Sequence, residues 1–131
     1  MKHWLVKTEA TVYSWHDLER DKVCVWSGVR NYQARNFMIQ MKKGDLVFVY
    51  HSGKSAAIVG VAKVVKEHYP DPEDPRFVLI DLVPVKKLDN EIQLVEIKNC
   101  IFLKDFILLR QKRLSVMPVT KEEWEQILKI I

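Results

Sequence analysis

The sequence is poor in the residues and motifs that build metal and nucleophile sites. Its only cysteines, Cys24 and Cys100, stand in neither a CxxC pair nor a cluster with histidine, which argues against zinc. The four glycines form no loop that could cradle a phosphate, and there is no Gly-x-Ser-x-Gly or His-Glu-x-x-His motif. We therefore expect no metal, no cofactor and no catalytic residues, and we favour binding over chemistry.

Long apolar runs are also absent. No stretch approaches the roughly 20 apolar residues that a membrane-spanning helix needs. The charged residues Lys2, Lys7 and Glu9 interrupt the first positions, unlike the apolar segment of a signal peptide. Two cysteines outside any framework are typical of buried free thiols in a reducing compartment. These features predict a soluble, intracellular, cytoplasmic protein with no membrane partner.

Length, composition and charge limit the number of domains and the kinds of partner. A chain of 131 residues is short enough to share one core, so residues 1–131 are expected to form a single domain. It is 48% hydrophobic and 29% charged, the balance of a globular protein. A net charge of +4 and a pI near 9.1 suit a nucleic-acid partner and suit simple solubility equally well. The oligomeric state is open, with a monomer favoured.

Apolar runs rich in branched residues predict the strands. These runs lie at residues 4–6, 46–50, 58–65 and 77–85. Gly60, inside one run, indicates either a bulge or the close approach of another group. Residues 69–75 contain three prolines and predict an irregular surface loop. Residues 101–109 are apolar enough for a helix or a strand, and periodicity does not decide between them.

Capping motifs and periodic apolar residues predict the helices. Ser14 and Asp17 can cap a short turn that continues through Leu18. A second helix is expected to begin near Asn31 and to stop at residues 42–45, where Gly44 suits the left-handed position. Its apolar stripe consists of Ala34, Phe37, Met38 and Met41.

The C-terminal segment predicts a third helix. Thr120 and Glu123 can form a capping box at its start. Its stripe of Trp124, Ile127, Leu128 and Ile131 predicts that the helix docks on the core, to which Trp4 also belongs. Several strands with helices at the start, middle and end indicate an α+β fold built on a small barrel.

Residues 26–37, Trp-Ser-Gly-Val-Arg-Asn-Tyr-Gln-Ala-Arg-Asn-Phe, have the composition of a binding segment. Tryptophan offers a stacking face, asparagine pairs with the edge of a heterocycle, and arginine binds phosphate. Core packing alone would not require this combination. The alternative for Trp26 is a core anchor, since most tryptophans are buried.

Three further polar segments stand at the ends of apolar elements, where barrel pockets form. They are residues 7–9 with 13–15, residues 50–52 and residues 113–116. Each has a simpler explanation: Lys7 and Glu9 can form an exposed ion pair, and His51 can be a structural histidine. Arg113 can be tied to a helix end or to a carboxylate such as Asp81. Their common position at element ends favours a pocket.

Taken in order, these motifs resemble the EVE domain family along essentially the whole chain. The matching segments are Trp-Leu-Val-Lys-Thr-Glu (4–9), Tyr-Ser-Trp (13–15), residues 26–37, Met-Lys-Lys-Gly-Asp (41–45), Tyr-His-Ser (50–52) and Arg-Leu-Ser-Val-Met-Pro-Val-Thr (113–120). The resemblance implies a PUA-like fold, a small bent β-barrel of about five or six strands with short helices around it. It also implies a non-enzymatic pocket for a modified nucleobase, such as a modified cytosine, turned out of DNA or RNA.

The resemblance also implies a set of pocket residues. That set is Lys7, Ser14, Trp26, Val29, Asn31, Tyr50, His51, Ser52, Arg113, Leu114 and Ser115. We expect Trp26 or Tyr50 to stack on the base, with Asn31 and Ser52 reading its edge. Phosphate contacts are expected from Arg30, Arg35 or Arg113, and a base methyl group near Val29 or Leu114.

Two departures and two alternatives accompany the resemblance. The family commonly has proline where this chain has Ala10, and residues 69–77 lack a tryptophan that often precedes the third long strand. One alternative is a hydrolase acting on acylated cytidine, as in the related ASCH proteins, with Lys7, Thr8 and Glu9 as working groups. The other is an interaction module whose pocket has lost its ligand.

Overall fold

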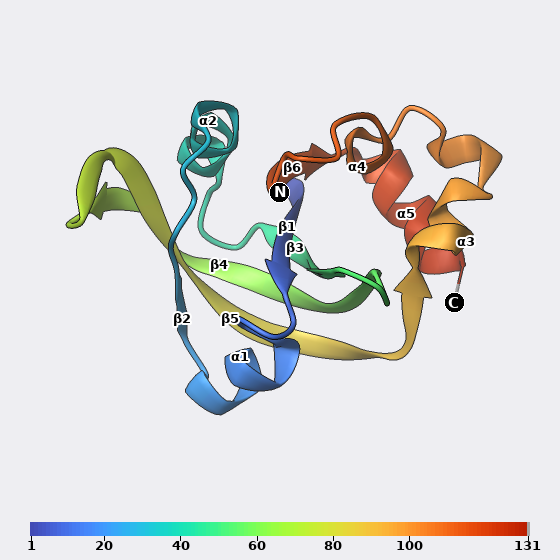
Figure 1. The fold of residues 1–131 in the computed structure, drawn as a ribbon, viewed down its shortest axis with the longest axis horizontal. Helices are drawn as coiled ribbons and strands as arrows, with labels where there is room; N and C mark the ends of the chain where they lie inside the picture. The colour runs from blue at the N-terminus through green and yellow to red at the C-terminus, as the bar shows by residue number, and fades with distance from the viewer. Residues whose placement is uncertain (131) are drawn as a thin grey trace.

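Six strands form one mixed sheet in the computed structural model, which describes residues 1–130 (Figure 1). The strands are β1 (His3–Glu9), β2 (Cys24–Trp26), β3 (Leu46–Ser52), β4 (Ala57–Asp71), β5 (Asp74–Gln93) and β6 (Val116–Val119). Their order in the sheet is β2-β5-β4-β3-β1-β6, with β1 and β3 parallel and every other pair antiparallel. The long strands β4 and β5 are coloured green to yellow in Figure 1 and make up most of the sheet.

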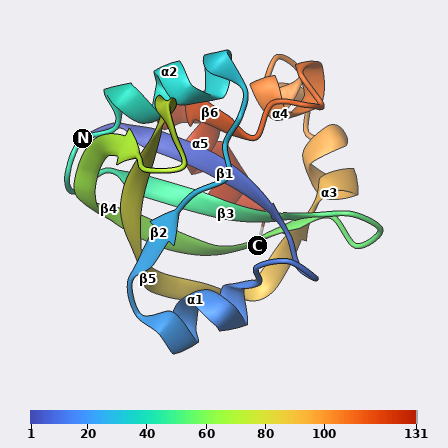
Figure 2. The same cartoon turned by 60° about the vertical axis from the view of Figure 1, so that its left-hand side comes forward.

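The sheet is strongly bent, as the turned view shows (Figure 2). Register shifts interrupt the β3–β4 and β4–β5 ladders, and such irregularities let strands curve. Within residues 1–130, the edge strands β2 and β6 form no ladder with each other, so the barrel stays open. The expected α+β, PUA-like architecture is confirmed with six strands in an unclosed sheet.

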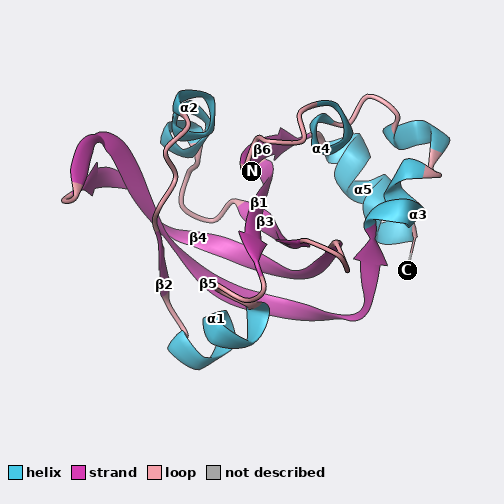
Figure 3. Ribbon diagram, in the orientation of Figure 1, coloured by secondary structure: helices cyan, strands magenta, loops and turns pink. Residues whose placement is uncertain are grey.

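Five α-helices and one 3₁₀ turn surround this sheet (Figure 3). They are α1 (Trp15–Asp21), α2 (Tyr32–Gln40), α3 (Leu94–Lys98), η1 (Ile101–Leu103), α4 (Ile107–Arg110) and α5 (Lys121–Lys129). Helices α3, α4 and α5 gather at one end of the molecule, and the β4–β5 hairpin projects at the other (Figure 1). In the described part of the chain, no helix is both long and apolar enough to cross a membrane.

Local sequence signals account for where the helices begin. Ser14 and Thr120 each form the expected capping box, with Asp17 and Glu123. Asn31 is the N-cap of α2, and its side-chain oxygen accepts a hydrogen bond from the Ala34 N–H at 2.9 Å. Each cap satisfies an N–H group that the first turn of a helix cannot pair internally.

Aromatic packing holds the elements together. Trp4 is buried, and its Nε1 donates to Asp45 at 2.9 Å, while Phe48 stacks on Trp124 at 3.7 Å between ring centroids. Gly60 lies against the ring of Trp15, where an added Cβ would come within 2.5 Å of ring carbons. The expected close approach at Gly60 is therefore confirmed, and a register shift beside it confirms the bulge as well.

Several local expectations were wrong. Residues 69–75 are not an irregular loop, since β4 continues to Asp71 and β5 begins at Asp74, leaving a two-residue turn. Pairing along the hairpin overrides the proline signal because prolines are tolerated at positions whose N–H is not needed by the ladder. The first strand does not end at residue 6, since residues 7–9 extend β1 beside β3.

The helical segments also differ from what their sequence patterns predict. Helix α2 ends at Gln40 with Met41 as its cap, so Gly44, with φ of +95°, belongs to a separate turn. Residues 101–109 are neither one helix nor a strand but a 3₁₀ turn followed by α4. Leu128 is 39% exposed and does not dock with Trp124, and Ile131 of the same stripe lies outside the described residues.

Candidate functional site

Two adjoining cavities open beside the end of β1. We call the first, of about 460 Å³, the lysine lobe, and the second, of about 510 Å³, the tryptophan lobe. Both are lined by Lys7, Thr8 and Ser115, which form the wall between them. The backbone N–H of Lys7 donates to the Ser115 carbonyl at 2.9 Å, so this wall joins β1 to the segment that precedes β6.

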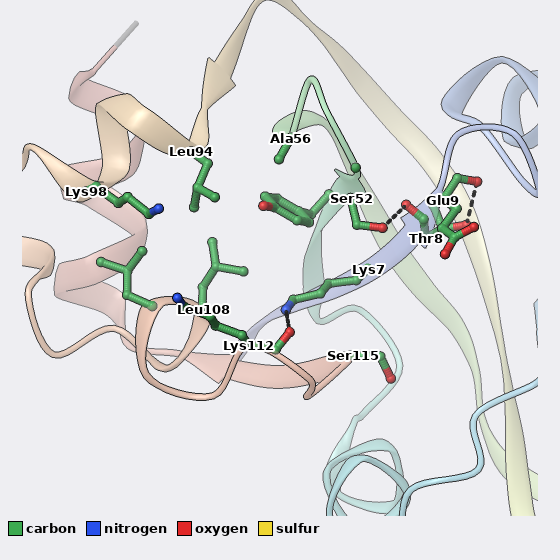
Figure 4. A pocket seen from close by; sticks show the side chains of 13 residues that line it. Lys7, Thr8, Glu9, Ser52, Ala56, Leu94, Lys98, Leu108, Lys112 and Ser115 are labelled. Atoms are coloured by element: carbon green, nitrogen blue, oxygen red, sulfur yellow. Dashed lines mark hydrogen bonds between the residues drawn. The ribbon is translucent and has the colours of Figure 1, made fainter.

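The lysine lobe combines an apolar lining with three ammonium groups (Figure 4). Besides the shared wall, its lining includes Tyr50, Ser52, Leu94, Lys98, Leu108, Leu109 and Lys112. Lys98 and Lys112 point into the same space between Leu94 and Leu108, while the carboxylate of Glu9 lies toward the opposite end. Helices α3 and α4 thus supply one part of this lobe, and strands β1 and β3 supply another.

Lys7 is half-buried at the centre of the wall. Its Nζ donates to the Lys112 carbonyl at 2.9 Å and lies 5.9 Å from the centroid of the Tyr50 ring. Burial lowers the pKa of Lys7 and raises the pKa of the Tyr50 hydroxyl, since removal from water disfavours the charged form of each. An anion entering the lobe would offset the cost of burying the Lys7 ammonium.

The tryptophan lobe is aromatic and rich in backbone groups. Trp26 and Tyr13 meet edge to face with ring centroids 6.2 Å apart, and Val29 adds an apolar wall. Gly28 has a φ of +79°, a conformation that glycine adopts without strain. Across residues 1–130, no protein group accepts a hydrogen bond from the backbone N–H of Gly28, Val29 or Arg30. These donors are left for solvent or a ligand.

The tip of the β4–β5 hairpin holds in place the segment that carries Arg30 and Arg35. Arg30 pairs with the buried carboxylate of Asp71 at 3.1 Å and lies over the ring of Phe77. Arg35 donates to the Arg76 carbonyl at 3.1 Å and to the Asn36 side chain. Arg30 and Arg35, two of the three arginines expected to bind phosphate, therefore have protein partners in this structure.

The structure brings only some of the expected pocket residues together. Those lining the two lobes are Lys7, Trp26, Val29, Tyr50, Ser52 and Ser115. Arg113, for which a pairing with Asp81 was one alternative, lines a separate cavity of about 330 Å³ with Asn31 and Leu114. Asp81 accepts a hydrogen bond from Tyr69. Ligand contact by the expected residues stays a prediction.

Ser14 and His51 have structural roles in the fold. Ser14 accepts from the Asp17 N–H at 3.1 Å as the N-cap of α1. His51 Nε2 accepts from the Trp15 N–H at 3.0 Å, one of the N–H groups that the helix leaves unpaired. Burial lowers the pKa of His51, which favours the neutral ring that this hydrogen bond needs.

Sequence reasoning missed the residues that α3 and α4 contribute. Leu94 and Lys98 precede, and Lys112 follows, the segment 101–109 whose secondary structure its pattern left open. The one available signal was the basic run at residues 112–113, which follows an apolar stretch. This basic run could suggest a charged cavity edge, but it could not show that Lys112 lies beside Lys7 of β1.

Comparison with known proteins settles the family. The family model described as EVE domain matches residues 2–130. The chain belongs to the EVE domain family. Chicken and human Thymocyte nuclear protein 1 are 35% and 33% identical to it, each alignment covering 98% of this chain and 68% and 73% of the relative. These relatives are called nuclear, whereas a cytoplasmic location stays a prediction for this EVE domain.

Solved structures agree with this EVE domain along its length. Rpa0253 from Rhodopseudomonas palustris superposes with a TM-score of 0.94 at 40% identity, covering 99% of this chain and 92% of that one. Human THYN1 protein in complex with 5-methylcytosine containing DNA gives a TM-score of 0.93 at 32% identity, covering 99% and 97%. An ASCH protein from Zymomonas mobilis, at 11% identity and a TM-score of 0.53, shares the fold alone.

Proposed function

We propose that this EVE domain is a non-enzymatic nucleic-acid reader whose tryptophan lobe holds a single modified base, such as a modified cytosine, flipped out of its strand. The observation that carries the proposal is a lobe with two aromatic rings and unpaired backbone donors beside a basic cavity. The human relative in complex with 5-methylcytosine containing DNA, at 32% identity, supports the same partner class.

The aromatic rings supply the affinity in this proposal. Trp26 is buried in the core, with 7% of its surface exposed, and also lines the lobe. A base turned out of its strand stacks on the part of the ring that faces the lobe, and such stacking is worth about 1–3 kcal/mol per base. Tyr13, held edge to face against Trp26, fixes the tryptophan ring so that little order is lost on binding. The volume of about 510 Å³ lies in the range of small-ligand pockets.

The backbone supplies the recognition of the base edge. The N–H groups of Gly28 and Val29 can donate to ring nitrogens or carbonyl oxygens, and the Ser115 hydroxyl can donate or accept. Val29 offers an apolar contact for a methyl group, worth about 1 kcal/mol for one buried carbon. In this arrangement a modified base differs from an unmodified one by a modest gain in binding free energy, which adds to the free energy of stacking.

The test is calorimetric titration with short single-stranded and duplex oligonucleotides that carry plain or modified cytosine or adenine. We expect affinity to depend on the modification, and Trp26→Leu to weaken binding about 10-fold or more while the protein still unfolds cooperatively in urea. The matched control is Phe102→Ala, which removes an exposed aromatic side chain on η1. It should bind as wild type.

Each other outcome points to a different function. Binding that ignores the modification and fades with salt would leave only a basic surface. Turnover of an acylated cytidine that disappears in Lys7→Ala would support the hydrolase alternative, for which Lys7 and Glu9 line the same lobe. Failure to bind any of these ligands would indicate an interaction module with an unused pocket.

A further inference from the structure

The lysine lobe is a second cavity that base recognition does not use. It places Lys98, Lys112 and Lys7 around one space, against the single carboxylate of Glu9 at its far end (Figure 4). In the described part of the chain, each ion pair uses an arginine and none a lysine. The three ammonium groups therefore face the cavity without compensating carboxylates.

The lining around these lysines strengthens their field. Leu94, Leu108 and the buried ring of Tyr50 exclude water from one side of the cavity, and charge interactions grow as the local dielectric falls. Lys98 and Lys112 are exposed, yet they line the cavity together with these apolar side chains. Here the apolar floor and the charges share one concave site, the arrangement expected for an anionic group attached to a larger ligand.

The position of the lysine lobe indicates which anion it takes. Lys7, Thr8 and Ser115 line both lobes, so a ligand in one cavity lies directly beside the other. Lys7 Nζ stands at this boundary, held by the Lys112 carbonyl. A nucleotide has the matching shape: an aromatic base on one side and a phosphate on the other.

We propose that the lysine lobe binds the phosphate group that adjoins the flipped base, with Lys98 and Lys112 as the residues that recognise it. This inference rests on the proposed function, because it assigns the base to the tryptophan lobe. It replaces Arg30 and Arg35, which are engaged with Asp71 and Arg76, as the source of the phosphate contact. Lysine serves here as a point charge for a phosphate oxygen.

The experiment compares four ligands by calorimetry: 5-methyl-2′-deoxycytidine, its 5′-monophosphate, its 3′-monophosphate and inorganic phosphate. We expect one monophosphate to bind about 10-fold more tightly than the nucleoside, with a gain that shrinks as salt is raised. The double variant Lys98→Gln/Lys112→Gln should reduce the affinity for that monophosphate to that for the nucleoside, and nucleoside binding should not change.

Lys86→Gln/Lys87→Gln is the matched control, since it also removes two positive charges, from exposed positions on β5 that line neither lobe. Equal binding of nucleoside and monophosphates, or an equal loss in this control, would overturn the phosphate site while leaving base reading intact. Binding of inorganic phosphate that the double variant abolishes, without any nucleoside binding, would support the phosphate site and refute the base assignment.

Discussion

The two lobes share one wall and differ in nearly everything else. The tryptophan lobe comes mainly from the consecutive segment 24–30, with Val12 and Tyr13, and the β4–β5 hairpin holds that segment through Arg30. The lysine lobe comes from β1, β3, α3 and α4, and within residues 1–130 no ion pair joins its charged groups. The cavity suited to a flat ring and the cavity suited to an anion thus come from different segments, and Lys7 lines both.

The arginines and the lysines of this protein are also used differently. Arg30 and Arg35 hold the protein together, through Asp71, Phe77 and the Arg76 carbonyl. The planar guanidinium suits such fixed contacts, whereas a lysine ammonium on a flexible stem can follow a ligand. Basic residues close to a binding motif in sequence are therefore not automatically its phosphate ligands.

The largest expected effect comes from removing the group that both lobes share. Lys7→Met keeps the apolar stem, removes the ammonium and leaves the Lys112 carbonyl without its donor. Because hydrogen bonds to charged groups contribute about 1.5–3 kcal/mol, calorimetry should show about 10- to 100-fold weaker monophosphate binding. Nucleoside binding should also weaken, and Lys86→Met serves as control. If nucleoside affinity were unchanged, Lys7 would belong to the lysine lobe alone.

An intermediate effect is expected from weakening the ion pair through which the hairpin holds the tryptophan lobe. Asp71→Asn retains an oxygen to accept from the Glu73 N–H but removes the charge that holds Arg30. Since Arg30 is partly exposed, urea unfolding should show a loss of about 1 kcal/mol, with several-fold weaker nucleoside binding.

The control for this ion pair is Asp105→Asn, which breaks an exposed pair with Arg110 beside the other end of the molecule. It should change neither stability nor nucleoside binding. Inorganic phosphate binding should be the same in both variants. A loss of phosphate binding in Asp71→Asn would mean that the two lobes are not independent.

The smallest effect on ligand binding is expected at His51. This residue lies between Tyr50 and Ser52 on β3, but it accepts a hydrogen bond from α1 and does not line the lysine lobe. Burial lowers the pKa of His51 in the folded protein from its ordinary value of 6.5. Below pH 6.5 the unfolded chain therefore binds the proton more readily than the folded protein does. Stability should therefore be fully present above pH 6.5 and be lost as the pH falls through the lowered pKa.

His51→Gln should remove that part of the pH dependence and cost about 1 kcal/mol at neutral pH. Urea unfolding at several pH values measures both effects. His3, whose pKa burial also lowers, remains in the variant, so the difference between the two proteins isolates His51. A change in ligand affinity in His51→Gln would show that His51 does belong to the binding site.

Local signals in the sequence were reliable where neighbours in the chain decide the outcome. The capping boxes at Ser14 and Thr120 and the buried strand at 46–50 were predicted correctly, because caps and strand patterns depend on residues a few positions apart. The hairpin at residues 69–75 was missed because strand pairing outweighed the prolines.

The sequence by itself determined the family, the α+β class and the segments that carry the aromatic and hydroxyl groups. Only the tertiary structure decided which of those groups meet. Lys7 and Lys112 are 105 positions apart, and they touch because β1 lies between β3 and β6 in the sheet. No local pattern encodes that neighbour. The order of strands is set by burying one common core, and the two lobes form where that order brings distant chain segments side by side.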